Sequence, residues 1–323
     1  FQAEDGIRDS VASRGLGDVY KRQGYNAEMM PILSGGKDKW YRPSDVAVGP
    51  DGSLFIADWF DPGVGGHGMR DLERGRIFRV IPKDHNGYSF EKRNVNTLDG
   101  AINALMSSDL ESRYLGWTSL HKMGLDKTEK ALMKLISDKD RIKRARAAWC
   151  LGKMPGAGDK VISKISKDLD SDMRIVAIRL ARQLGSNVES LISELSNDVS
   201  FQVKRECAIA LRELDGENVA KLWAKLALQH NGSDRWYLEA LGIAADGNWD
   251  NCFKAWIEAG GKWDSKAGKD IVWRSRGKMA PEFLAKIVKG PNTNEEEKPR
   301  YMRAFDFHSG PEKDAALQSI LLE

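Results

Sequence analysis

Apolar and small residues return along the chain at a nearly constant interval of 30 or 31 residues, each time behind a basic residue. Within a copy they lie three, six, seven and ten positions after that residue, and the copies begin at Arg113, Arg144, Arg174, Lys204 and Arg235. These offsets place the apolar side chains on one face of a helix. A second apolar segment follows each copy. The pattern therefore predicts helix pairs, without strands, from about Thr97 onward.

One such pair cannot bury its apolar face alone, so the pairs must stack on their neighbours. The chain is therefore predicted to be mainly α, with a HEAT-type α-solenoid of about six or seven helix pairs over residues 97–323. Ala147, Ala177 and Cys207 fall at equivalent places in the repeat and are expected to be buried.

Two less regular copies follow the first five, around Arg274 and Arg303. The interval from Arg235 to Arg274 is wider than the intervals before it, which predicts a longer connection near Gly260 and Gly261.

Aspartates stand four positions before several of these basic residues: Asp109, Asp140, Asp170 and Asp270. We interpret them as helix caps or ladder contacts that hold adjacent repeats in register. The alternative is a groove lined by arginines for an anionic partner. The repeat pattern resembles HEAT repeats, specifically the short bacterial version of about 30 residues.

Residues 1–23 contain neither an apolar run nor a helical or strand period. They resemble translated sequencing-adapter sequence. We expect them to be a disordered artefact, with a native disordered tail as the alternative. An artefact at this position would mean that the native protein is longer at its N-terminus.

Residues 24–96 change to a strand period. Strands are expected over 45–48, 54–58 and 76–81, with a tight Pro-Asp-Gly turn at 49–52 and a glycine-rich loop over 59–75. Three short antiparallel strands of this kind are typical of one β-propeller blade. We expect this segment to be a partial propeller and a linker.

The runs Tyr41–Asp45, Gly49–Gly52 and Ala57–His67 carry a closer resemblance. They resemble the end of the propeller in the membrane-bound dehydrogenase-like proteins of planctomycetes, verrucomicrobia and Bacteroidetes. Those propellers look like glucose or sorbosone dehydrogenases, and HEAT repeats follow them, often with a cytochrome c domain. The chain departs from that pattern because it has about one blade and no Cys-x-x-Cys-His motif.

Composition narrows the function classes. The net charge is +3 with 30% charged residues, which gives no strong signal for nucleic acid or anionic membranes. No apolar stretch approaches the roughly 18 residues of a membrane span. The three cysteines are far apart and fit reduced core positions. Only the resemblance favours a periplasmic or membrane-associated location.

The loop from Trp59 to Arg74 is the candidate chemical site, because the resemblance implies that this face of the propeller carries quinone and substrate. His67 is the candidate general base. Asp58 or Asp61 would orient it or hold calcium, and Arg70 or Arg74 would bind a carboxylate of the quinone PQQ. Asp71 lies in the same loop. The structural alternatives are a turn cap at Asp58 and an ion pair between Arg70 and Asp71.

Two functions therefore stay open. The first is a fragment of a quinone-dependent sugar or alcohol dehydrogenase-like protein, with the HEAT repeats as spacer or docking scaffold. Its partners would be the other propeller blades and a cytochrome c domain or protein. One blade cannot wall a quinone pocket, so we expect this chain to be inactive alone. The second is a non-enzymatic protein- or carbohydrate-binding scaffold, for which exposed members of the ten tryptophans would form a stacking strip.

Overall fold

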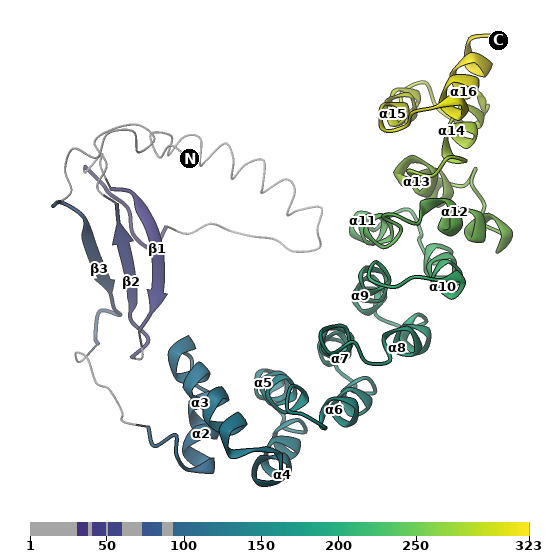
Figure 1. Cartoon of the computed structure of the whole chain (residues 1–323). Coiled ribbons are helices and arrows are strands. Elements are labelled where there is room, and N and C mark those ends of the chain that lie inside the picture. Colours follow the sequence, from purple (N-terminus) through teal and green to yellow (C-terminus); the bar gives the residue numbers. More distant parts are fainter. Residues whose placement is uncertain (1–30, 38–40, 50, 60–72, 86–92, 323) are drawn as a thin grey trace. The chain divides into compact units, whose positions relative to one another are not determined.

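The computed structural model of the chain describes residues 31–37, 41–49, 51–59, 73–85 and 93–322. It divides into two compact units, residues 1–131 and 132–323. Residues 1–23, which we expected to be an artefact, lie outside the described residues. The fold is mainly helical, with a small antiparallel sheet on its N-terminal side (Figure 1), as the sequence predicted.

The sheet of the first unit has three strands in the order β1-β2-β3. They run over Pro43–Val48, Leu54–Asp58 and Arg76–Val80, close to the predicted ranges, and both neighbouring pairs are antiparallel. Val46 pairs with Ile56, and Ile56 with Phe78, so one face of the sheet carries a row of apolar side chains.

The turn between β1 and β2 is held by its own side chains. Gly49 donates its backbone N–H to the Ser53 carbonyl at 2.7 Å, and the Ser53 hydroxyl donates to the Asp51 carboxylate at 2.6 Å. Arg79 of β3 binds the same carboxylate at 2.5 Å. The Ser53 hydrogen bonds, followed by the Arg79 charge, lower the pKa of Asp51 to about 2. The turn therefore also ties β3 to the hairpin.

After the three strands, the helices begin at Leu98. In the first unit α2 (Leu98–Leu105) packs against α3 (Leu110–Met123), and α4 (Leu125–Leu135) follows. Thr97 caps α2, and Asp109 caps α3 by accepting the Ser112 N–H at 2.7 Å. A Cβ on Gly116 would come within 2.4 Å of the Leu105 backbone nitrogen, so only glycine allows this approach of α3 to α2.

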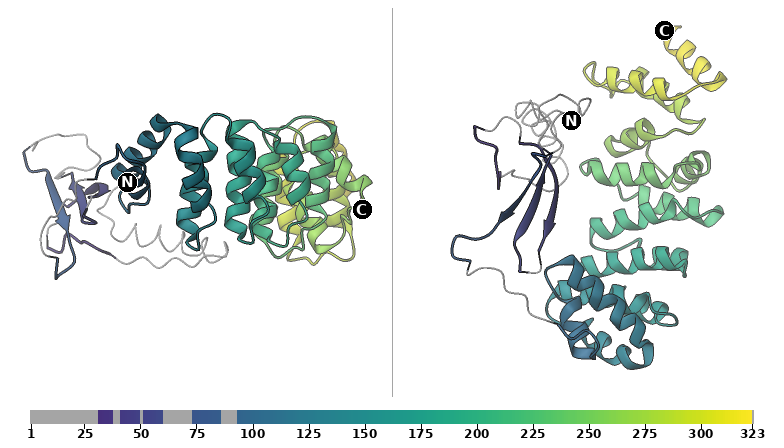
Figure 2. Two further views of the ribbon diagram at one scale, coloured as in Figure 1. Left: turned by 90° about the horizontal axis from the view of Figure 1, so that it is seen from below. Right: turned by 60° about the vertical axis from the view of Figure 1, so that its left-hand side comes forward.

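The second unit is a stack of helix pairs in which successive helices alternate between two rows (Figures 1 and 2). We call them the first row and the second row. The first row comprises α5 (Arg141–Gly152), α7 (Ser171–Leu184), α9 (Phe201–Leu211), α11 (Arg235–Ala244), α13 (Lys266–Arg274) and α15 (Lys298–Ala304). The second row comprises α6 (Gly158–Ile165), α8 (Val188–Leu195), α10 (Glu217–Ala227), α12 (Trp249–Glu258), α14 (Ala280–Lys289) and α16 (Pro311–Leu321). The short 3-10 helix η2 (Phe305–Phe307) follows α15.

The small residues of the repeat lie where this packing is tightest. Ala147, Ala177 and Cys207 are all fully buried, which confirms the predicted equivalence of the three copies. Small side chains at these places let neighbouring first-row helices approach closely. No strand follows α2 among the described residues, so the helical prediction from about Thr97 onward also holds.

The aspartates cap helices and link repeats, as the favoured interpretation required. Asp140 caps α5, and Asp170 caps α7. Asp170 also accepts from Arg144 of the preceding repeat at 2.7 Å. Arg174 in turn binds Asp198 with two hydrogen bonds, of 2.6 and 2.8 Å. Arg144 and Arg174 thus each reach the loop that opens the next repeat.

The register of the fifth copy differs from the prediction. The helix N-caps Asp140, Asp170 and Ser200 are evenly spaced along the chain, but the next N-cap, Asp234, comes four positions later than this spacing would place it. Arg235 therefore starts α11 instead of standing in its second turn, and Leu238 takes the place of the basic residue.

The loop before α13, residues 259–265 with Gly260 and Gly261, is longer than the loops before α7 and α9 (166–170 and 196–200), as predicted, and the α10–α11 loop, residues 228–234, is equally long. From Asp234 to the α13 cap at Ser265 the spacing returns to nearly that of the earlier repeats. The position of the basic residue in this repeat, which was predicted to be Arg274, is occupied by Lys269. Lys269 is buried and donates to the Asn292 carbonyl at 2.7 Å. The sequence pattern misled here because a basic residue also stands three positions early, at Arg235.

Candidate functional sites

Of the residues expected to carry chemistry, the structure describes Asp58 and Arg74. Asp61, His67, Arg70 and Asp71 lie outside the described residues. Arg74 is exposed and stands two positions before β3.

Asp58 is a buried residue at the end of β2. One carboxylate oxygen accepts the Arg42 backbone N–H at 2.7 Å. The other is bound by the guanidinium of Arg76, with an Nη2 distance of 2.5 Å. Asp58 of β2 is thus linked to Arg42, directly before β1, and to Arg76 of β3.

No three His, Cys, Asp or Glu side chains within the described ranges lie close enough to hold a metal ion. We derive no step through calcium or PQQ. The three cysteine thiols are buried, and burial raises the pKa of Cys150, Cys207 and Cys252 to about 12. A thiol with such a pKa stays protonated and is a poor nucleophile.

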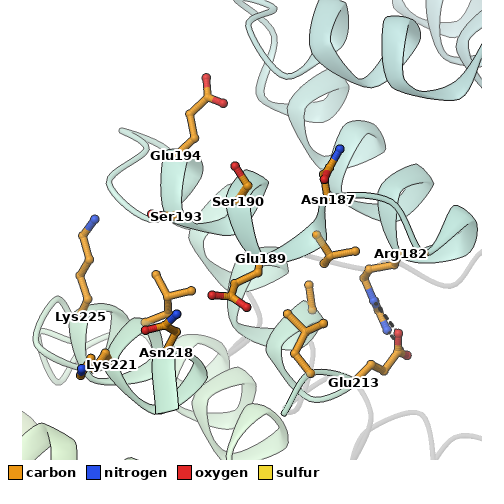
Figure 3. A pocket seen from close by; sticks show the side chains of 15 residues that line it. Arg182, Asn187, Glu189, Ser190, Ser193, Glu194, Glu213, Asn218, Lys221 and Lys225 are labelled. Atoms are coloured by element: carbon orange, nitrogen blue, oxygen red, sulfur yellow. Dashed lines mark hydrogen bonds and ion pairs between the residues drawn. The ribbon is translucent and has the colours of Figure 1, made fainter. Parts of the chain in front are cut away.

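A groove of about 1120 Å³ opens between α8 and α10 (Figure 3). Glu189 and Glu194 come from α8, and Lys221 and Lys225 come from α10, so side chains of both charges line the groove. At one end Arg182 binds Glu213 at 2.6 Å. The residues that line the groove include neither histidine nor cysteine. It therefore offers binding groups of both signs.

A second groove of about 820 Å³ follows between α10 and α12. The two share Leu214 and Lys221 along their rims. Its charged groups are also mixed, with Arg212 bound to Asp246 at 2.7 Å. Such grooves arise wherever second-row helices splay between repeats.

The outward face of the first row differs from both grooves. Counting from each N-cap, the ninth residue of five successive first-row helices points away from the second row. These five residues, which we call the outward column, are exposed or half-buried, and none is acidic: Trp149, Arg179, Ile209, Ile243 and Arg274.

Charge is also divided between the rows. The six first-row helices carry sixteen Lys and Arg against four Asp and Glu, a net charge of +12. The six second-row helices carry eight against nine, a net charge of −1. Part of the first-row charge serves the ladder, because Arg144 and Arg174 bind aspartates of the next repeat and Lys204 and Lys269 are buried. Other first-row arginines are also paired, such as Arg182 with Glu213 and Arg274 with Glu239.

Sequence reasoning missed the outward column. The repeat was noticed through its buried positions and its basic residue, whereas the outward positions vary from Trp to Arg to Ile. Counting nine residues from each predicted cap would have found three of the five. Ile243 and Arg274 can be found only when the shifted N-caps of α11 and α13 are known.

The tryptophans of the helical region are divided between buried and half-buried positions. Trp223, Trp249 and Trp256 are buried in the second row. Five others are half-buried: Trp117, Trp149, Trp236, Trp263 and Trp273.

No protein-family model and no curated protein matches the chain. A crystal structure of an engineered protein is similar at a TM-score of 0.36 and 18% identity, covering 69% of this chain and 71% of that one. Among the described residues, none of the helices combines the length and the apolar character that crossing a membrane requires.

Proposed function

We propose that the helical unit is a docking scaffold for another protein, bound through the outward face of the first row. The observation that carries this proposal is the outward column, which repeats apolar and basic side chains over five helices without one acid. Solenoids present such extended surfaces because each repeat adds the same set of positions. Tryptophan, arginine and isoleucine are also side chains that contribute strongly to protein interfaces.

Internal contacts strengthen the argument. The ladder residues Arg144 and Arg174 are satisfied by the next repeat, so they need no partner. The apolar outward residues are different, since Ile243 keeps 38% of its surface exposed. An apolar side chain gains from being covered, by roughly 25 cal/mol for each Å² removed from water.

A displayed peptide library selected on the full chain tests this function. Selected peptides should lose binding to an Ile243→Asp variant, because the charge interrupts the outward column. Leu228→Asp is the matched control, since Leu228 is a similarly exposed apolar residue at the end of a second-row helix. Equal loss in both variants, or no selected peptide at all, would exclude docking on this face.

We also propose, as a second function, that the parent protein is dehydrogenase-like and that the helices act there as spacer or docking scaffold, in the periplasm or at its membrane. The three-stranded antiparallel sheet supports this proposal because it has the strand order of a blade. The chain alone should show no sugar-dependent dye reduction with added PQQ and calcium. In an intact homologue with the same loop, His67→Ala should lower turnover about 10²-fold if His67 is the general base.

A further inference from the structure

The α5 end of the first row concentrates positive charge around exposed apolar side chains. We define the α5–α7 face by five residues: Ile142, Arg146, Trp149, Lys153 and Arg179. Ile142 is 56% exposed, and Lys153 is exposed at the C-cap of α5. The Lys153 ammonium lies 5.7 Å from the centre of the Trp149 ring. The face thus presents an indole and an isoleucine between cations.

The charge of this face is not balanced by its own helices. Helix α5 carries four basic residues and no acid, and α7 carries three basic residues against Asp172. Arg179 binds Glu206 of α9 at 2.8 Å, yet its side chain remains 56% exposed. A guanidinium has five N–H donors in a planar fork, so one carboxylate leaves others for a second. Glu206 therefore orients the Arg179 guanidinium and leaves some of its N–H donors available.

We infer that the α5–α7 face binds an acidic segment of a partner protein, with apolar side chains between its carboxylates. This inference rests on the proposed docking function and names the chemistry of the partner. Carboxylates would bind Lys153 and Arg179, while apolar side chains would cover Ile142 and Trp149. Neighbouring helices in a stack lie about 8–10 Å apart, and an extended chain rises about 3.3 Å per residue. A partner carboxylate every third residue would then match successive helices.

A nucleic acid fits this face less well. Asp172 and Glu206 stand beside the arginines on the next helices, within 3.4 Å of Arg141 and 2.8 Å of Arg179. An unbroken row of phosphates would pass these carboxylates and be repelled, whereas a peptide can place its few carboxylates singly. The uncharged side chain of Ile142 also offers nothing to a phosphate.

Fluorescence anisotropy with short labelled peptides tests the inference on the full chain. The probes are a 12-residue peptide of Glu and Leu, the same peptide with Lys for Glu, and a single-stranded oligonucleotide of equal charge. We expect the acidic peptide to bind best, with an affinity that falls as salt rises. Lys153→Glu should weaken it about 3–10-fold, and Ile142→Ser by a similar factor. Lys164→Glu, an exposed charge reversal on second-row α6, should leave it unchanged.

Circular dichroism melts of each variant separate lost binding from lost folding. Equal affinity for the Glu and Lys peptides, tighter binding of the oligonucleotide, or equal weakening by Lys164→Glu would overturn the acidic partner. The docking function itself would survive these results if library peptides still depended on Ile243. It would fail separately if they did not.

Discussion

The repeats from α5 to α9 and the repeats from α10 to α14 build the same architecture with different interactions. In the earlier repeats the second-row helices are aliphatic, and a charged ladder joins each repeat to the next, with Arg174 holding Asp198 at 2.6 Å. In the later repeats Leu238 replaces the basic residue, and aromatic side chains take over. Trp223 meets Trp249 at 5.7 Å, and Phe253 meets Phe283 at 5.4 Å between ring centres.

The two regions also differ in how the loops join them. The extra residues before α11 contain Gln229, which accepts from Lys204 at 3.0 Å and donates to the Ser196 carbonyl at 3.0 Å. The Nε2 atom of His230 lies 3.5 Å from a carboxylate oxygen of Asp270 on α13. The loop thus contacts the earlier repeats through Gln229 and the later, aromatic repeats through His230. The earlier repeats contain fewer residues, which suits contacts between small aliphatic side chains. The repeat before α11 contains more residues, which accommodates large aromatic rings.

The largest effect should come from Trp223→Ala in the aromatic region. Trp223 is fully buried, and its indole N–H donates to the Leu241 carbonyl at 2.8 Å. Its removal leaves a cavity and takes away this buried hydrogen bond, so we expect a loss of about 3–5 kcal/mol in the free energy of unfolding. Because each repeat contacts only its neighbours, hydrogen exchange should speed up in α10–α12 and hardly change in α5–α7. Uniform acceleration would contradict the division into two regions.

Arg174→Met tests the charged region. The side chain of Asp198 is only 6% exposed, and it would lose its guanidinium partner. A buried carboxylate without a partner is costly, so we expect a loss of about 2–3 kcal/mol, measured by urea unfolding. Combining it with Asp198→Asn should recover part of this loss, since the uncompensated charge is then gone. A double variant less stable than Arg174→Met would argue against the unpaired charge as the cause.

The sequence predicted those features of the fold that depend on residues close together in the chain, and it missed those that depend on contacts between distant residues. Strand ranges, buried small residues and N-caps depend on neighbours in the chain, so Ala147, Asp140 and β2 were placed correctly. The residue at which α11 starts depends on the contacts that Gln229 and His230 of the α10–α11 loop make with other repeats. The sequence pattern does not reveal such tertiary contacts, and Arg235 was taken for the basic residue of the repeat because it stands near the expected position. The contacts of Asp58 were not predictable in this way, because its partner Arg76 is distant in the sequence.

Ala177→Phe probes close packing in the charged region. Ala177 is fully buried at the place where Ala147 and Cys207 stand in the neighbouring repeats. A phenyl ring would push α7 away from its neighbours, and overpacking of this kind costs about 1–3 kcal/mol. Ala177→Ser is the control, because it keeps the volume almost unchanged. A Phe variant as stable as wild type would mean that the first-row helices can move apart freely.

Acid should weaken the charged ladder at Asp198. Burial by itself would raise the pKa of Asp198, but the Arg174 hydrogen bonds and the Ser200 N–H outweigh it, and the pKa is lowered. A carboxyl whose pKa is lower in the folded state stabilises the fold above its unfolded pKa of about 3.9 and loses this effect as the pH falls through the folded value. The stability difference between wild type and Asp198→Asn should therefore shrink below about pH 4. A difference independent of pH would mean that the charge of Asp198 does not contribute.

The smallest effect should come from Arg212→Ala. Arg212 binds Asp246 at 2.7 Å across the junction of the two regions, but the two side chains are 55% and 62% exposed. Water and salt screen such a pair, and fixing two long side chains costs entropy, so the expected loss is about 0–1 kcal/mol. Repeating the Arg174→Met and Arg212→Ala measurements at low and high salt sharpens the contrast, because only the exposed pair should lose its contribution. A loss at Arg212 as large as that at Arg174 would show that the ladder's strength does not come from burial, and would remove the physical basis for separating the charged region from the junction that follows it.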